Sequence, residues 1–268
     1  MSAIIAIIGG TGVYDPAILS DLREEKVKTP YGEVQVQLGK YEGQEVAFVP
    51  RHGEKHSVPP HRINYRANIW SLQELGVQRA IATAAVGSLN SDMKPKDLVM
   101  IDQFLDFTRG REQSFYEGGE EGVFHLDVTF PYCRELRQAL FQSAKRQGLN
   151  AHFHGTYVCT EGPRFETTAE IRMYRQLGGD VVGMTSVPEV VLARELGICY
   201  ATIAMVTNYA AGISPNPLTH SEVVEVMAQN VTNLRKVIMG ALKELKPERC
   251  NDCAAILKEA PVRVGRRD

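Results

Sequence analysis

Ala3-Ile-Ile-Ala-Ile-Ile-Gly-Gly-Thr-Gly12 opens the chain with an uninterrupted apolar run that leads directly into a glycine-rich turn. No basic residue precedes the run, and it is too short to cross a membrane, so we expect neither a signal peptide nor a membrane span. A β-strand buried on both faces explains the run better, because such strands are nearly continuous in Val, Ile and Ala.

Similar apolar runs recur along the chain and alternate with amphipathic stretches. The expected strands are Ala3–Ile8, Val46–Val49, Arg79–Ala85, Leu98–Ile101, Val181–Met184 and Cys199–Val206. The expected helices are Ile63–Leu75, Cys133–Gln147, Ala169–Leu177, Pro188–Leu196 and Ser221–Leu245. Three glycines, Gly148, Gly178 and Gly197, stand where helices should end. By itself this alternation predicts a largely parallel sheet with helices on its faces.

The composition is typical of a soluble globular protein. Of 268 residues, 44% are hydrophobic and 23% are charged, which allows a substantial core. Thirty Lys and Arg against thirty-two Asp and Glu give a net charge of -2, so a general attraction to nucleic acid or to a membrane is not expected. We expect a cytoplasmic protein with one domain over residues 1–245 and a peripheral tail over residues 246–268.

Five cysteines are scattered through the sequence, and their odd number gives no disulfide framework. Cys133, Cys159 and Cys199 lie in expected helices or strands, where core packing is their expected role. Cys250 and Cys253 form a CxxC pair near the end of the chain, but a structural zinc site normally has four ligands, and no second pair lies nearby in the sequence. An exposed tail and no metal site are therefore expected there.

The segment Phe107–Val123 interrupts the pattern of strands and helices. It is polar and aromatic, with Arg109-Gly-Arg111 followed by a Gly- and Glu-rich run. Long loops in compact domains are often functional. A lid, a subunit contact and simple surface variation all remain open.

Three loops that follow expected strands are suited to an anion. Thr11 lies in the glycine turn after the first strand, and Arg51 and His52 follow Val49-Pro50, where Arg51 could clamp an oxyanion bidentately and His52 could add a donor. The small residues of Thr83–Ser88 leave the backbone open to close approach. Strand ends converge on one edge of such sheets, so these loops predict a shared binding site.

The most specific stretch is Gly155-Thr-Tyr-Val-Cys-Thr-Glu-Gly-Pro-Arg-Phe-Glu-Thr-Thr-Ala-Glu170, followed by Val182–Ala193 and Ala204–Asn208. With these motifs, the sequence resembles the trimeric purine nucleoside phosphorylase and methylthioadenosine phosphorylase family over nearly its whole length to Leu245. The resemblance implies a single-domain α/β/α sandwich with a mixed, partly barrel-like central sheet, which amends the parallel sheet. It also implies a homotrimer, or a hexamer made of two such trimers, that uses inorganic phosphate as co-substrate and needs no other cofactor.

The resemblance also implies roles for particular residues. The expected phosphate site comprises Thr11, Arg51, His52, Ala84, Ala85 through its backbone, and Thr185. Ala84 stands where methylthioadenosine phosphorylases usually have Thr, which weakens one phosphate contact. The remaining expected substrate contacts are Met184 under the ribose, Phe165 against the base, and Glu166, Asn208, Tyr209, Ala210 and His220.

Glu166 and Asn208 decide the base in this scheme. The resemblance places the Asn208 amide at N7 and the 6-carbonyl, where adenine-preferring relatives usually have Asp, and the Glu166 carboxylate at N1–H. Adenine presents a bare N1 lone pair to that carboxylate, which leaves a buried charge unpaired. The expected reaction is therefore phosphorolysis of inosine or guanosine in purine salvage, with Asn208, Glu166 and His52 as catalytic residues.

Two histidines bear on the sugar and on assembly. His220 matches the residue that contacts the ribose 5′-hydroxyl, where methylthio-specific relatives carry an apolar residue, and a polar imidazole suits a hydroxyl better. His125 resembles a residue that reaches the neighbouring subunit's site. The alternative activity is phosphorolysis of 5′-methylthioinosine or 5′-methylthioadenosine, and a non-catalytic nucleoside-binding protein is the alternative of a different class.

Overall fold

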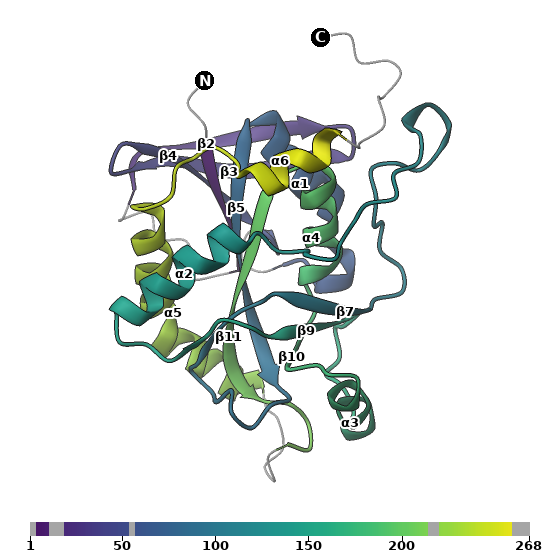
Figure 1. Cartoon of the computed structure of the whole chain (residues 1–268), viewed down its shortest axis with the longest axis vertical. Helices are drawn as coiled ribbons and strands as arrows, with labels where there is room; N and C mark the ends of the chain where they lie inside the picture. Colours follow the sequence, from purple (N-terminus) through teal and green to yellow (C-terminus); the bar gives the residue numbers. More distant parts are fainter. Residues whose placement is uncertain (1–3, 11–18, 54–56, 214–219, 259–268) are drawn as a thin grey trace.

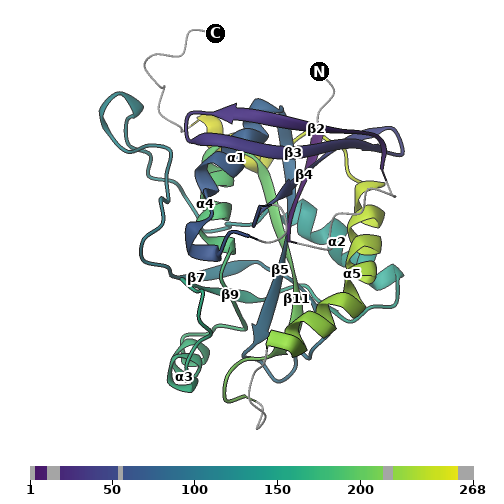
Figure 2. The same cartoon turned by 180° about the vertical axis from the view of Figure 1, so that it is seen from behind.

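A mixed β-sheet forms the centre of the molecule, with helices on both of its faces (Figure 1 and Figure 2). The computed structural model describes residues 4–10, 19–53, 57–213 and 220–258. The strands in this part of the chain are β1 (Ile4–Gly9), β2 (Ser20–Thr29), β3 (Gly32–Tyr41), β4 (Gln44–Pro50), β5 (Val77–Ser88), β6 (Leu98–Met100), β7 (Gln103–Phe107), β8 (Ala151–His152), β9 (Thr156–Thr160), β10 (Val181–Gly183) and β11 (Cys199–Tyr209).

The helices cover the sheet in two layers. They are α1 (Tyr65–Glu74), α2 (Arg134–Arg146), α3 (Thr168–Gln176), α4 (Ser186–Glu195), α5 (His220–Leu242) and α6 (Asn251–Ala255), with short 3-10 turns at Pro60–Arg62, Gly119–Glu121 and Ile256–Lys258. Alternate residues of β1 point to opposite sides. Ala6 and Ile8 join the core under α1 and α4, whereas Ile5 and Ile7 join the core under α2 and α5.

Every strand and helix expected from the sequence is present, and the sheet is mixed. β1 is parallel to β4 and β5, β11 is parallel to β5, and β9 is parallel to β7 and β10. In contrast, β10 runs antiparallel to β5, β6 runs antiparallel to β11, and β3 runs antiparallel to β2 and β4. The mixed sheet implied by the resemblance is confirmed, and the alternation alone accounts only for its parallel pairs.

The sheet forks along β5. β11 pairs with one edge of this strand from Arg79 to Ser88. On the other edge, β1 pairs only as far as Ala82, and β10 begins to pair only at Gly87. Between these two partners, the edge of β5 at residues 83–86 has no neighbouring strand among the described residues, so a cavity can open against its backbone.

The hairpin of β2 and β3 was not expected from the sequence. These two strands extend the sheet beyond β4, in the order β2-β3-β4-β1. On β3 the buried residues Val34, Val36 and Leu38 alternate with more exposed ones, because one face packs on α1 and the other is open to solvent. The exposed charged run of β2 suits the edge position of that strand.

The three glycines expected to end helices do so. Gly148, for example, follows α2 with a φ of 68°, and the next N–H, that of Leu149, donates to the Ala144 carbonyl at 3.1 Å. This bond satisfies a carbonyl in the last turn that has no partner inside the helix, and a glycine adopts the required left-handed conformation without steric cost.

The long segment that follows β7, here taken as residues 108–130, arches away from the sheet and returns to it (Figure 1). Two of its side chains are fully inside the protein. Phe115 packs against Trp70, with ring centroids 5.0 Å apart, and the side chain of Arg111 is only 2% exposed. The segment is thus anchored to the domain at these two points, which simple surface variation does not require.

The described part of the expected tail also packs on the domain. Arg79 Nε donates to the Glu248 carbonyl at 2.6 Å, and the Arg249 N–H donates to the Gln78 side chain at 2.9 Å. Cys253 is only 5% exposed. The expectation that Cys250 and Cys253 lie in an exposed tail is therefore wrong, because α6 is folded against the body. Among the described residues, no helix has both the length and the apolar character needed to cross a bilayer.

Candidate active site

A cavity of about 300 Å³ opens where the sheet forks, beside residues 83–86 of β5. This volume lies at the lower end of the range for small-molecule sites. Ten of the residues expected to bind substrate or phosphate line it: Arg51, His52, Ala84, Ala85, Phe165, Glu166, Met184, Thr185, Asn208 and Ala210. Segments that are far apart in the sequence thus meet at one site.

Arg51, at the end of β4, is held by a buried ion pair. Its Nε and Nη2 each donate to a carboxylate oxygen of Glu189 at 2.7 Å, and its Nη1 donates to the Thr83 carbonyl at 2.7 Å. Tyr200 also donates to Glu189, at 2.6 Å. Burial by itself lowers the pKa of the Arg51 guanidinium, but the Glu189 carboxylate outweighs burial and keeps the pKa above its ordinary value.

This arrangement limits the edge of Arg51 that could bind an oxyanion, and the expected bidentate contact stays a prediction. The Nε–Nη2 edge of the guanidinium is already occupied by Glu189. The three bonds to described residues leave two of the five N–H groups of the guanidinium for an anion in the cavity. Arg51 is therefore a fixed cation in the wall rather than a mobile clamp.

His52 follows directly and is also buried. Its Nδ1 lies 2.9 Å from the Val58 carbonyl. A carbonyl only accepts, so Nδ1 carries a proton, and Nε2 is an acceptor in the neutral ring and a donor in the charged ring. His52 can therefore supply the expected second donor to an anion through Nε2 only as an imidazolium.

Thr185 brings a hydroxyl to the same region. It precedes α4, and its side chain makes no capping hydrogen bond within the described chain. Its N–H donates to the Tyr157 hydroxyl at 3.2 Å. The backbone is extended at Val187, with φ -114° and ψ 131°, so the regular helix begins only after that residue. It is therefore the Thr185 hydroxyl, rather than a helix end, that suits an anion in the cavity.

Glu166 reaches the cavity from the turn before α3. The helix itself is capped by Thr167 and Glu170, whose side chains form a reciprocal capping box. Glu166 is not needed for that cap, and its carboxylate accepts a 2.6 Å hydrogen bond from Thr160. Burial raises the pKa of the Glu166 carboxyl, although the bond from Thr160 opposes the rise.

Asn208 owes its position to a β-bulge in β11. Val206 pairs with Val86 and Asn208 pairs with Gly87, so Thr207 is an extra residue on this strand. Successive residues of a regular strand point to opposite faces, but here both Thr207 and Asn208 line the cavity. Asn208 Oδ1 accepts from the Thr207 hydroxyl at 2.7 Å, and Nδ2 donates to the Tyr209 carbonyl at 2.9 Å.

Two neutral side chains, Met184 and Phe165, complete the apolar lining that the sequence predicted. Met184 lies directly over Gly162, where a Cβ atom on the glycine would approach the Met184 sulfur to 2.6 Å. Gly162 has a φ of 69°, a backbone conformation that glycine adopts without steric cost. Phe165 is 45% exposed, which leaves its ring accessible from the mouth of the cavity.

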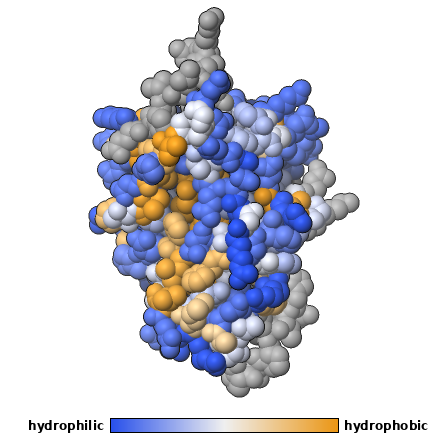
Figure 3. All heavy atoms as spheres, turned by 90° about the vertical axis from the view of Figure 1, so that its right-hand side faces the viewer, coloured by the Kyte–Doolittle hydropathy of each residue, from blue (hydrophilic) through white to orange (hydrophobic). Residues whose placement is uncertain are grey.

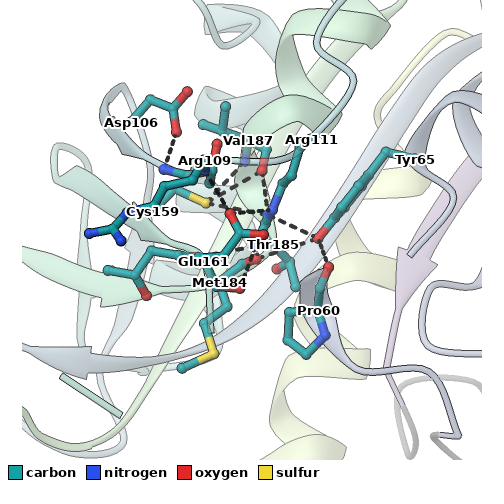
Figure 4. Close-up of polar contacts among 12 residues, drawn as sticks. Pro60, Tyr65, Asp106, Arg109, Arg111, Cys159, Glu161, Met184, Thr185 and Val187 are labelled. Carbon is teal, nitrogen blue, oxygen red and sulfur yellow. Dashed lines mark hydrogen bonds and ion pairs between the residues drawn. The ribbon is translucent and has the colours of Figure 1, made fainter. Parts of the chain in front are cut away.

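Arg111 holds the two backbone segments that carry Glu166 and Met184 by hydrogen bonds to their carbonyl groups (Figure 4). Its Nη1 donates to the carbonyls of Met184 and Val187 at 2.8 and 2.7 Å, and its Nη2 donates to those of Thr160 and Glu161 at 3.1 and 2.8 Å. One side chain from the long segment therefore ties together the strand that precedes Glu166 and the turn that carries Met184 and Thr185.

The comparison with protein-family models gives one match over most of the chain. The model described as "Phosphorylase superfamily" matches residues 4–243, which include the described residues that line the cavity.

The chain belongs to the phosphorylase superfamily.

Relatives within the superfamily cover nearly the whole chain. The "Probable 6-oxopurine nucleoside phosphorylase" of Moorella thermoacetica is 60% identical over 93% of this chain and 96% of its own. The "6-oxopurine nucleoside phosphorylase" of Pyrococcus furiosus is 58% identical over 96% of this chain and 98% of its own. The "S-methyl-5'-thioadenosine phosphorylase" of the same organism is 50% identical over 95% and 97%.

A solved structure confirms the superfamily fold. The methylthioadenosine phosphorylase of Schistosoma mansoni in complex with adenine superposes with a TM-score of 0.90 at 32% sequence identity, over 97% of this chain and 99% of the other. The α/β fold with a mixed sheet flanked by helices is therefore that of the superfamily.

Four expected site residues are not seen in the cavity. Thr11 lies outside the described residues, and only the backbone of His220 is described, at the start of α5. Tyr209 contributes its carbonyl to Asn208 but does not line the cavity. His125 is exposed on the long segment and does not line the cavity of its own chain. The roles of these residues stay predictions.

The sequence did not single out two buried charged residues that hold the cavity wall, Glu189 and Arg111. Glu189 stands alone among apolar residues in Val187–Ala193, and a single charge in an apolar helix signals a buried partner. Arg111 gave no such signal, because arginines in a polar, Gly-rich segment are usually solvated. Only the return of the long segment to the sheet gives Arg111 its contacts.

Proposed function

We propose that this chain is a purine nucleoside phosphorylase that converts inosine and guanosine, with inorganic phosphate, into the free base and ribose 1-phosphate in purine salvage. One observation carries this proposal: Glu166, Asn208 and Arg51 line the same cavity. Glu166 and Asn208 suit a 6-oxopurine, and Arg51 suits an anion. The names of the relatives at 58 and 60% identity support the same activity.

The phosphate end of the cavity is formed by groups that donate hydrogen bonds. Arg51, His52 as an imidazolium, and the Thr185 hydroxyl lie there, beside the open backbone edge of β5 at Ala84 and Ala85. Ala84 supplies no side-chain donor at its position, so its backbone contributes instead. Thr11 is expected to complete this subsite.

The reaction exchanges one bond at C1′ for another. A phosphate oxygen forms the new bond to C1′ while the bond from C1′ to N9 breaks and its electron pair leaves with the purine. Phosphate below the ring stabilises the positive charge that develops on the sugar, and the Asn208 amide donates toward N7 as negative charge develops on the base. Phosphate itself is the nucleophile, so we propose that catalysis uses neither a metal nor an organic cofactor.

The base end of the cavity favours a 6-oxopurine. One Nδ2 hydrogen of Asn208 is directed to the Tyr209 carbonyl, and the other is available to N7 or the 6-carbonyl. Glu166 is oriented by Thr160 and accepts from N1–H of hypoxanthine or guanine, and in guanine from the 2-amino group. Adenine offers no N1 hydrogen, so it would leave the carboxylate unpaired.

The alternative substrates differ at the 5′ carbon of the sugar. One relative, 50% identical, is named S-methyl-5'-thioadenosine phosphorylase, and this name supports a 5′-methylthio sugar as the alternative substrate. The expected contact of His220 with a 5′-hydroxyl argues for the unmodified sugar. The choice between 5′-hydroxyl and 5′-methylthio substrates is thus made at the start of α5, away from the base contacts.

We also propose that the protein is a cytoplasmic homotrimer with His125 reaching a neighbouring subunit, and that a hexamer of two trimers is the alternative assembly. Figure 3 shows apolar side chains gathered on the side of the molecule that carries the long segment and α3. The exposed apolar residues of these two elements are Val123, Val128, Phe130, Met173 and Leu177. Contiguous exposed apolar surface favours a protein interface, and light scattering that gives a monomer mass with full activity would contradict the trimer.

The direct test measures phosphate-dependent base release from inosine, guanosine, adenosine, 5′-methylthioinosine and 5′-methylthioadenosine, and compares kcat/KM. We expect inosine and guanosine to be preferred over adenosine by about tenfold or more. A preference for methylthio sugars would overturn the role of His220, and a preference for adenine as the base would overturn the base scheme. Nucleoside binding without any turnover would indicate a binding protein instead.

A paired variant tests the base contacts separately. Glu166→Ser with Asn208→Asp should move the preference toward 6-aminopurines, because the carboxylate at N1 is removed and an acceptor for the 6-amino group is introduced. Glu166→Gln alone is the matched control, since it keeps an acceptor for N1–H. A double variant that retains its preference for inosine would show that these residues do not select the base.

A further inference from the structure

Four of the five cysteines converge at one point, although they come from three separate parts of the chain. Cys133 is the N-cap residue of α2, Cys199 is the first residue of β11, and Cys250 and Cys253 lie at the start of α6. Their four sulfur atoms all lie within 4.8 Å of one another. The second cysteine pair that a zinc site requires is thus supplied by the fold rather than by the neighbouring sequence.

The separations match a shared metal ion rather than sulfur–sulfur bonds. The Cys250 sulfur lies 3.7 Å from that of Cys133 and 3.5 Å from that of Cys199. Four sulfurs bound tetrahedrally to zinc at about 2.3 Å lie about 3.8 Å from each other. Sulfurs in a disulfide are about 2.05 Å apart, so the observed separations are too long for disulfides and fit four ligands of one ion.

The surroundings suit four thiolates around a dication, which together carry a net charge of about -2. The N–H of Cys250 donates to the Cys199 sulfur at 3.2 Å, and Cys133 lies at the positive end of α2, where a thiolate is stabilised. Arg79 is the register partner of Cys199 on β5, so the two side chains leave the sheet on the same face. Its Nη1 is buried and has no hydrogen-bond partner in the described part of the chain.

We propose that Cys133, Cys199, Cys250 and Cys253 bind one Zn²⁺ in a closed, structural site. Binding converts four thiols into zinc-bound thiolates and releases four protons to solvent, with no change of oxidation state. With four protein ligands, no position remains for substrate or water. The site lies where β11 begins, and Asn208 lies where β11 ends (Figure 1), so the ion would fasten α6 to the domain rather than take part in phosphorolysis.

The test is the metal content of the full-length protein, purified without chelators under reducing conditions. Elemental analysis should find about one zinc per chain, and Cys250→Ser and Cys253→Ser should each lower that content severalfold. Cys159→Ser is the matched control, because Cys159 is a buried cysteine outside the cluster, and this variant should retain zinc. Cobalt substitution should give the d–d absorption of a tetrahedral thiolate centre in the parent protein and not in Cys250→Ser.

Three outcomes would overturn the proposal. One is a protein that contains no zinc and takes none up when Zn²⁺ is added to the reduced chain. Another is an intact mass, measured on protein purified without reductant, that is four hydrogens lower than that of the reduced chain, which would show that the four cysteines form two disulfides. The third is iron in place of zinc. Because every readout is independent of turnover, none of these results depends on the proposed phosphorolysis.

Discussion

Glu189→Gln removes the negative charge from the buried ion pair at the proposed phosphate end of the cavity while nearly preserving side-chain shape. Glu189 is fully buried and receives two hydrogen bonds of 2.7 Å from Arg51 and one of 2.6 Å from Tyr200. In the variant, the amide NH₂ would face a donor of Arg51. The guanidinium charge would then lie in the interior without a counter-charge.

The expected loss of stability follows from this burial. Removing one partner of a buried ion pair costs about 3–5 kcal/mol. A loss of 1 kcal/mol lowers the Tm of a chain of this size by roughly 2–4 °C, so the Tm should fall by roughly 6–20 °C. Inorganic phosphate should raise the Tm of the variant more than that of the parent, because it would supply the missing negative charge beside Arg51.

Thermal unfolding of Glu189→Gln, of Arg51→Gln and of the double variant, with and without phosphate, measures the pair in a double-mutant cycle. The double variant should lose less than the sum of the single losses, because neither charge is then left alone. Glu33→Gln is the control, since Lys26 and Glu33 form an exposed pair at 2.8 Å that solvent screens, so its loss should leave the Tm nearly unchanged. Additive losses, or a Tm for Glu189→Gln equal to that of the parent, would refute the reasoning.

Three further predictions concern the walls of the cavity. Arg111→Lys should lower the free energy of unfolding, measured in urea, by about 2 kcal/mol or more and should lower kcat/KM. The reason is that one ammonium cannot replace the donors that reach four carbonyls. An unchanged unfolding midpoint would contradict the support role. The folded-state pKa of Glu166 is raised above about 4.5, so its contribution to stability is present below that pH and is lost as pH rises through the folded-state pKa. Glu166→Gln should therefore gain stability relative to the parent with rising pH, and parallel Tm curves would argue against a raised pKa. Gly183→Ala would bring a methyl group into steric overlap with the Tyr157 hydroxyl and should lower the free energy of unfolding by about 1–3 kcal/mol. Gly110→Ala, where the added methyl group meets open space, should lower it little. Equal losses in the two variants would show that the close approach to Tyr157 is unimportant.

The sequence by itself determined the local elements and much of the site. Continuous apolar runs such as that of β1 predict buried strands, and glycines such as Gly148 mark helix ends, because both signals depend on neighbouring residues only. The motif around Glu166 and Asn208 identified the family, and the structure places both residues in one cavity. The β2–β3 hairpin was missed although its signal was present, since Val34, Val36 and Leu38 alternate with polar residues.

Tertiary structure alone decided how those elements combine. The fork at β5 leaves the backbone of residues 83–86 open to the cavity only because β1 ends its pairing before β10 begins. Sheet order and helix packing also set three other features. They are the bulge at Thr207, the ion pair of Arg51 with Glu189 and the contact of Cys133 with Cys250. Local sequence patterns encode the conformation of a segment, but contacts across a hundred or more residues depend on the whole fold, which no single motif contains.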